Sequence, residues 1–346
     1  MVCPEYLYDY DYDNETNEAL VDILDCLPKE INITSKRVPL KYMYTGMYSL
    51  VLLLGVCLNG LVIVLTCRMK KTTGTIWFLG LAVTDLTFCV FLPFMIIYAM
   101  NDFNWTFGLI MCKLNSYVMF INMFSTALIL TFLSVHRCFS ALNADCFKKC
   151  CTALTATNMV WASWFISAIL STPSLVLRDI AQTPERVICF DNYTYGFLNL
   201  NTTEGKVRIK VVILTRFIFG LFLPFFIIGL GSSLVLLKSN YKFTSSKSYR
   251  IVRIMIFAYF LCWGPYHVFM LVALHSRFLG ADVVAYGLPV VTILATCNSC
   301  INPMIYILKG KDMKMSWMED IFVTKEPNKL EEVSTPLKSH HSGVDA

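Results

Sequence analysis

Residues 79–88 read LGLAVTDLTF, an apolar run that carries one carboxylate, Asp85, in its second half. Two other apolar runs carry an amide each: Asn59 lies in GVCLNGLVIV and Asn302 lies in CNSCINPMIY. An ionisable side chain in a membrane span is costly and is tolerated where it faces a partner or an ion. Each asparagine alone is explained by a bond to the backbone of a neighbouring helix, but Asp85 demands a partner or an ion.

The composition indicates a membrane protein. Of the 346 residues, 56% are hydrophobic and 15% are charged, whereas soluble domains are about 45–50% apolar and about 25% charged. The net charge of +5 is mild, and the basic residues lie between apolar runs without forming a stripe. We therefore expect membrane lipids, and no nucleic acid, among the partners.

Seven stretches are long and apolar enough to cross a membrane as helices, which takes about 20 residues each. They lie near 43–67, 75–100, 110–138, 155–177, 209–237, 249–274 and 284–308. Several contain a proline, which a membrane bundle tolerates because neighbouring groups satisfy the freed carbonyls. These prolines are Pro93, Pro173, Pro224, Pro265 and Pro303. The sequence predicts an all-α membrane protein, a seven-transmembrane helix bundle over residues 42–309.

The distribution of charge predicts the orientation of the bundle. The segments after the first, third and fifth runs hold ten Lys or Arg residues, against six in the alternate loops. Basic loops stay in the cytoplasm, so we expect an extracellular N-terminus and a multi-pass protein of the plasma membrane. Glycosylation motifs fall only in the expected outer segments. The predicted acceptors are Asn14, Asn32, Asn192 and Asn201, and a further motif at Asn104 lies close to the membrane.

The motifs of the seven runs occur in the order and at the spacing of one family. Together they resemble the rhodopsin-like, or class A, G-protein-coupled receptors over about residues 43–322. The matching positions are Asn59, LAVTDL with Asp85, Cys112, Trp164, Pro173, Pro224, Cys262-Trp263-Gly264-Pro265 and Asn302-Pro303-Met304-Ile305-Tyr306. The resemblance implies a disulfide between Cys112 and Cys189 on the outer side.

The resemblance also assigns roles within the bundle. It implies a hydrated polar core able to hold a sodium ion, the one cofactor we expect, formed by Asn59, Asp85, Asn122, Thr126 and Asn302. It implies an activation switch formed by Trp263 beneath the ligand pocket, helix kinks at Pro224, Pro265 and Pro303, and Tyr306. Arg137 would contact the heterotrimeric G protein once the sixth helix swings outward.

Longer stretches are similar to the chemoattractant receptors, which bind complement anaphylatoxins, formyl peptides or chemerin. They include IWFLGLAVTDLTFCVFLPF, INMFSTALILTFLSVHRC and TRFIFGLFLPFF. Arg216 in the last of these matches an arginine that the group uses toward anionic peptide termini, and Arg178 is placed near the pocket mouth. The alternative for Arg216 is an arginine that reaches to the membrane surface.

The N-terminal residues 1–41 form an acidic, tyrosine-rich segment that we expect to be extracellular and disordered. Tyr6, Tyr8, Tyr10 and Tyr12 alternate with aspartates. Acid-flanked tyrosines are typical substrates of tyrosine sulfation, and the added negative charge would steer a basic ligand toward the pocket. The alternative is a tail that is merely soluble.

Two positions depart from the family pattern. His136 stands where the family has the acidic residue that pairs with Arg137, and Ser232 stands where the fifth helix has a tyrosine. We expect a receptor for a peptide or small-protein chemoattractant that signals through inhibitory-class G protein to chemotaxis and calcium mobilisation, and that binds arrestin. The alternative is a scavenger or arrestin-biased receptor with weak G-protein coupling.

The C-terminal residues divide into two segments. Met313, Trp317, Met318 and Ile321 fall on one helical face, which predicts a short amphipathic eighth helix on the membrane over residues 310–322. Residues 323–346 are polar and predicted to be a disordered cytoplasmic tail. The sequence contains no metalloprotease, nucleotide-binding or serine-hydrolase motif and no transporter-like repeat, so we expect neither an enzyme nor a transporter.

Overall fold

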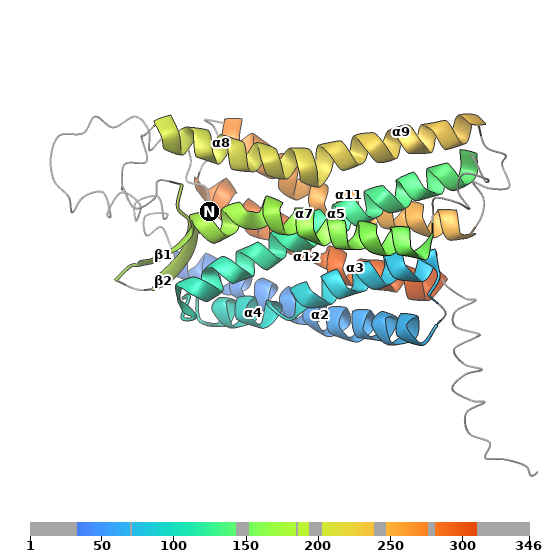
Figure 1. Ribbon diagram of the computed structural model, residues 1–346. Helices are drawn as coiled ribbons and strands as arrows, with labels where there is room; N and C mark the ends of the chain where they lie inside the picture. Colours follow the sequence, from blue (N-terminus) through green and yellow to red (C-terminus); the bar gives the residue numbers. More distant parts are fainter. Residues whose placement is uncertain are drawn as a thin grey trace, which may run out of the picture. The chain divides into compact units, whose positions relative to one another are not determined.

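The computed structural model describes residues 33–69, 71–142, 152–184, 186–193, 203–238, 247–275 and 281–309. Within them lie seven helical spans long and apolar enough to cross a membrane, as predicted (Figure 1). The helices are α2 (Ile33–Arg68), α3 (Thr73–Cys89), α4 (Leu92–Met100), α5 (Gly108–Leu142), α7 (Ala153–Leu177), α8 (Thr203–Phe217), the π-helical segment η2 (Ile218–Phe222), α9 (Leu223–Lys238), α11 (Lys247–His275) and α12 (Ala281–Lys309). The second span is α3 followed by α4, and the fifth is α8, η2 and α9.

Local sequence explains where several helices begin and bend. Thr72 caps α3, because its hydroxyl accepts a hydrogen bond from the backbone of Thr75 while the Thr75 hydroxyl accepts one from the backbone of Thr72. Pro93 lies in the first turn of α4, where no hydrogen bond is lost. The π-helical turn of η2 ends just before Pro224, and such turns often mark functional positions.

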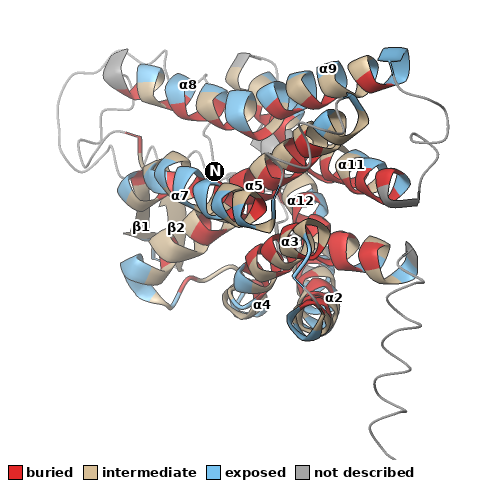
Figure 2. Ribbon diagram, turned by 45° about the vertical axis from the view of Figure 1, so that its right-hand side comes forward, coloured by how far each residue is buried: buried red, intermediate tan, exposed pale blue. Residues whose placement is uncertain are grey.

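The buried faces of the helices turn toward one another (Figure 2). Large exposed side chains such as Phe165, Phe225 and Leu237 lie on the outside of the bundle. An apolar exterior is what a lipid environment requires, because lipid replaces water as the solvent. The interior holds a cluster of aromatic, aliphatic and methionine side chains from several spans.

A two-stranded hairpin covers one end of the bundle (Figure 1). Its antiparallel strands are β1 (Arg178–Gln182) and β2 (Val187–Asp191). The predicted disulfide joins Cys189 in β2 to Cys112 in α5. The backbone of Trp105 also donates a 2.8 Å hydrogen bond to the carbonyl of Val187. The hairpin is therefore fixed to the start of α5 by a covalent bond and to the loop before α5 by a backbone hydrogen bond.

One predicted boundary differs from the structure. Helix α2 begins at Ile33, inside the range 1–41 that the sequence assigned to a disordered tail. The helix is 36 residues long, and about 20 residues span the hydrocarbon layer. A helix satisfies its own backbone hydrogen bonds, so it can continue past the apolar run into the tail.

Several predicted features lie outside the described residues. They are the sulfation candidates Tyr6, Tyr8, Tyr10 and Tyr12, the glycosylation candidates Asn14, Asn32 and Asn201, the amphipathic helix 310–322 and the tail 323–346. Each stays a prediction.

Trp164 provides a test of the packing between spans. Its indole N–H donates a 2.8 Å hydrogen bond to the Thr84 hydroxyl on α3, whereas Trp161 one turn earlier is 63% exposed. Trp164→Phe should lower the free energy of unfolding by about 1–2 kcal/mol, from the lost hydrogen bond and lost packing. Trp161→Phe, the matched control, should change it by less than about 0.5 kcal/mol. Thermal unfolding of the purified protein measures both; equal shifts would contradict the contact between α7 and α3.

Candidate functional site

Asp85 lies at the meeting point of three spans and is 0% exposed. Its two carboxylate oxygens accept hydrogen bonds from different helices: Asn122 of α5 donates at 2.8 Å and Asn302 of α12 donates at 3.1 Å. The hydroxyl of Ser299 donates to Asn122 at 3.4 Å. A buried carboxylate needs such partners because an unpaired charge in a low-dielectric interior is costly.

The first span is tied to the same centre through Asn59. Its amide donates to the carbonyl of Ser299 at 2.8 Å and to that of Gly55 at 2.9 Å. Next to this bond lies a cavity of about 10 Å³, lined in part by Asn59, Asn302 and Tyr306, with room for about one water molecule. The structure thus brings together four of the five residues predicted for the polar core.

Thr126, the fifth of these residues, is buried, and its hydroxyl has no hydrogen-bond partner among the described residues. It lies one turn along α5 from Asn122. An ordered ion or water is the usual partner of such a group. Sodium binding at this centre remains a prediction.

His136 and Arg137 lie toward the end of α5 that is opposite the hairpin. The His136 ring is buried and packs edge-on against Trp77, with ring centroids 6.1 Å apart. Arg137 forms no ion pair with any described residue. The arrangement agrees with the loss of the acidic partner that the sequence indicates.

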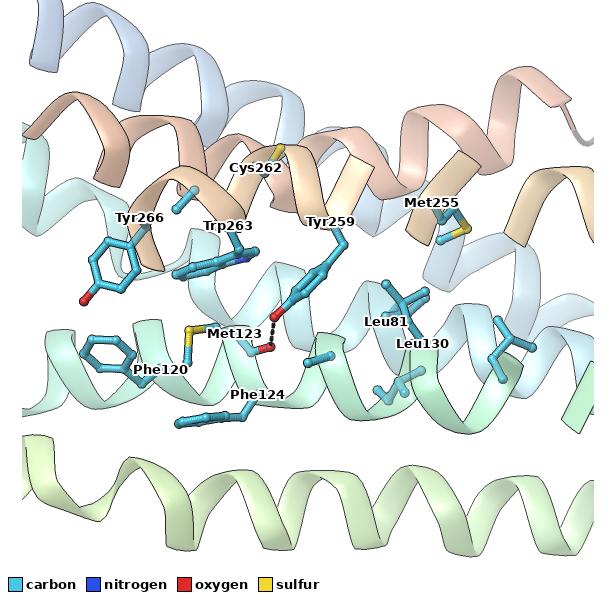
Figure 3. Close-up of a cluster of buried hydrophobic side chains, with 14 of the residues drawn as sticks. Leu81, Phe120, Met123, Phe124, Leu130, Met255, Tyr259, Cys262, Trp263 and Tyr266 are labelled. Carbon is cyan, nitrogen blue, oxygen red and sulfur yellow. Dashed lines mark hydrogen bonds between the residues drawn. The ribbon is translucent and has the colours of Figure 1, made fainter. Parts of the chain in front are cut away.

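Trp263 occupies the middle of α11 within the aromatic cluster (Figure 3). Its ring contacts Tyr266 at a centroid distance of 5.8 Å and His267 at 6.4 Å. Figure 3 places Trp263 beside Met123 of α5, with Tyr259 one turn earlier along α11. The predicted switch residue therefore lies in the buried cluster where α11 packs against α5.

Tyr259 bonds α11 to the π-helical turn of the fifth span. Its hydroxyl donates a 2.6 Å hydrogen bond to the carbonyl of Gly220 and lies 3.5 Å from the carbonyl of Met123. A Cβ added to Gly220 would lie 3.1 Å from the His267 ring, so glycine permits this close approach. The contact joins the third, fifth and sixth spans through one phenol, and it was not predicted from the sequence.

Arg216 lies near the hairpin end of the fifth span and is 6% exposed. Its guanidinium lies 3.7 Å from the centroid of the Phe120 ring, a cation–π contact, and donates a 3.4 Å hydrogen bond to the Ser174 hydroxyl. Tyr266 of α11 and Asp191 of β2 also interact electrostatically with it. Four different elements thus converge on this cation.

Arg178, predicted at the pocket mouth, pairs with Asp191. The Arg178 Nε atom lies 3.0 Å from Asp191 Oδ1, and the Tyr193 hydroxyl donates to Asp191 Oδ2 at 3.5 Å. Burial raises the pKa of Asp191. The positive charges of Arg178 and Arg216 lower it by a larger amount, so the net pKa lies below its ordinary value. The Asp191 carboxylate is therefore ionised at neutral pH.

Three members of this cluster, Asp191, Tyr193 and Tyr266, were not predicted from the sequence. Asp191 ends strand β2 and Tyr193 follows it by two residues, in a stretch that carries no local sequence pattern of its own. One feature of the sequence could have indicated them. The expected disulfide between Cys189 and Cys112 brings the residues that follow Cys189 to the N-terminal end of α5. The predicted glycosylation site Asn192 lies between them, and its side-chain amide donates to Asp179 at 3.1 Å.

Tyr259→Phe tests the bond between α11 and the fifth span. The change removes the hydroxyl that binds the Gly220 carbonyl, so the free energy of unfolding should fall by about 1 kcal/mol. Tyr42→Phe, at a tyrosine that is 69% exposed, should be neutral within about 0.5 kcal/mol. Thermal unfolding of both variants is the measurement, and an unchanged Tyr259→Phe protein would contradict the contact.

Comparisons with known proteins agree with this arrangement. The family model "7 transmembrane receptor (rhodopsin family)" matches residues 58–306. Chemerin-like receptor 1 of Sus scrofa is 35% identical over 317 residues, 88% of this chain and 87% of its own. The human Chemerin-like receptor 1 is 36% identical over 308 residues, 86% and 81% of the two chains. Chemerin-like receptor 2 of Rattus norvegicus is 32% identical over 270 residues, 77% and 75% of the two chains. The chain belongs to the rhodopsin family of seven-transmembrane receptors and, within it, to the chemoattractant subgroup.

Proposed function

We propose that this protein is a cell-surface receptor for a peptide or small-protein chemoattractant that presents an anionic group to Arg216. The observation that carries the proposal is the burial of this arginine at the hairpin end. An arginine that reaches to the membrane surface keeps its charged head in water or among lipid headgroups. Arg216 instead points its guanidinium at Phe120 inside the bundle.

The relatives support the class of ligand. Their names describe receptors of the chemerin-like kind, so a chemerin-like peptide is the first ligand to test, followed by anaphylatoxins and formyl peptides. A carboxylate is the group that a guanidinium binds best, through paired charge-assisted hydrogen bonds. We propose that the ligand inserts such a group between Arg178 and Arg216.

The orientation of the bundle in the membrane and the N-terminal tail are also part of the ligand-binding proposal. The hairpin end and the N-terminus face the outside of the cell, in accord with the charge distribution of the loops. Sulfated Tyr6, Tyr8, Tyr10 and Tyr12 raise the local concentration of a basic ligand.

Signal transfer follows from the order of the contacts along α11. A ligand at Arg216 disturbs Tyr266, which touches Trp263, and the Tyr259 bond to the fifth span lies one turn below. Release of that bond lets the far end of α11 move outward and exposes Arg137 to an inhibitory-class G protein, with arrestin as the later partner. A sodium ion at Asp85 favours the resting packing.

The scavenger alternative rests on His136 and Ser232 alone. The relatives do not favour it, since each is described as a receptor of the chemerin-like kind. Guanine-nucleotide exchange on inhibitory-class G protein separates the two functions, because a scavenger recruits arrestin without exchange.

Arg216→Ala tests the proposed ligand site. In membranes of cells that express the receptor, a chemerin peptide should drive nucleotide exchange, and Arg216→Ala should weaken its potency at least about tenfold, about 1.4 kcal/mol. Lys210→Ala removes a positive charge from an exposed position on the same helix and serves as the matched control with unchanged potency. Full potency of Arg216→Ala, at equal surface expression, would remove this arginine from the ligand site.

A further inference from the structure

The anion site at the hairpin end already contains an anion from the receptor itself. Asp191 and Arg178 are cross-strand partners in the hairpin register, and their side chains form the 3.0 Å ion pair. The Asp191 side chain is 8% exposed, and its electrostatic partners include Arg216. One carboxylate thus serves two buried or half-buried guanidinium groups.

We propose that Asp191 is an internal counter-ion that occupies the site of the ligand's carboxylate, so an anionic ligand binds by displacing it. The inference rests on the proposed function in one respect, that Arg178 and Arg216 receive the ligand's anionic group. It adds Asp191 as a competing anion, which sets how tightly a ligand's carboxylate must bind the two arginines in order to displace it. A neutral ligand cannot replace the charge of Asp191, so the same competition selects for a carboxylate.

The hairpin holds Asp191 in place from both sides. Two residues before it, Cys189 is bonded to Cys112. The backbone of Asn192, the next residue, donates a 2.6 Å hydrogen bond to the carbonyl of Leu177. The backbone at Asp191 is therefore anchored, and its carboxylate leaves the arginines by rotation of the side chain while the hairpin stays in place.

The energetics favour an exchange of anions over an empty site. Removal of one partner from a buried ion pair leaves an uncompensated charge, which is strongly destabilising. Here the loss of Asp191 would leave the charges of both Arg178 and Arg216 without this carboxylate. A ligand carboxylate that takes its place restores the balance, and the freed Asp191 side chain returns to water at the bundle end.

A ligand-free experiment tests the anion site itself. Asp191→Ala leaves a space of the size of a carboxylate beside the two arginines, and the full-length receptor should unfold at a lower temperature. Sodium acetate should recover most of the lost unfolding temperature, whereas sodium chloride at the same ionic strength and acetamide at the same concentration should not.

The matched control for this experiment is Asp179→Ala, in the same hairpin. Asp179 accepts hydrogen bonds from the Ile180 backbone and from Asn192, so acetate should not rescue its variant. Equal effects of acetate on wild type, Asp191→Ala and Asp179→Ala would overturn the proposal.

A second experiment uses ligand and remains informative if Asp191→Ala fails to fold. Asp191→Asn keeps the shape and an acceptor for Tyr193 but removes the competing charge. It should bind a C-terminal chemerin peptide with a free carboxylate about tenfold more tightly than wild type does, with no gain for the same peptide as its amide. Unchanged or weakened binding of the free acid would overturn the role of Asp191.

The outcomes separate this inference from the proposed function. If Arg216→Ala loses affinity for the free acid but Asp191→Asn gains none, the ligand site stands and the counter-ion role falls. If acetate rescues Asp191→Ala but no chemerin peptide binds, the internal anion site stands and the proposed ligand class falls.

Discussion

The fold depends on the cost of burying the Asp85 carboxylate. Asn122 and Asn302 bind one oxygen each, and Asn59 connects the first span to the same point through the Ser299 carbonyl. Four spans are thereby held around a charge that lipid cannot solvate. The same contacts limit how the helices rearrange, because any movement of α12 or α5 changes the partners of a buried anion.

A second cluster, at the hairpin end, also surrounds buried charges with partners, but here positive charge exceeds negative charge. Arg178 and Arg216 share Asp191, and the aromatic ring of Phe120 supports the deeper arginine. Next to this cluster, Tyr266, Trp263 and Tyr259 follow one another along α11 (Figure 3), and the Tyr259 hydroxyl reaches the carbonyls of Gly220 and Met123.

Much of this arrangement was predictable from the sequence. The apolar runs located all seven spans, and polar residues inside them identified the Asp85 centre, because a buried charge must have partners. Asp191 and Tyr259 were not predictable by the same reasoning. Asp191 acquires its role from strand register and from the Cys112–Cys189 bond, and Tyr259 acquires its role from a π-helical turn opposite it. Both depend on pairing between distant segments. The helical continuation of α2 back to Ile33 was also missed, because no apolar pattern marked it.

We propose that Asp85 is a charged, cation-receptive centre of the bundle. The most direct measurement is the unfolding temperature of the purified receptor in sodium chloride and in choline chloride at equal ionic strength, for wild type and for Asp85→Asn. Sodium should raise the unfolding temperature of the wild type and leave that of Asp85→Asn unchanged. The same sodium-dependent rise in both proteins, or in neither, would contradict the claim.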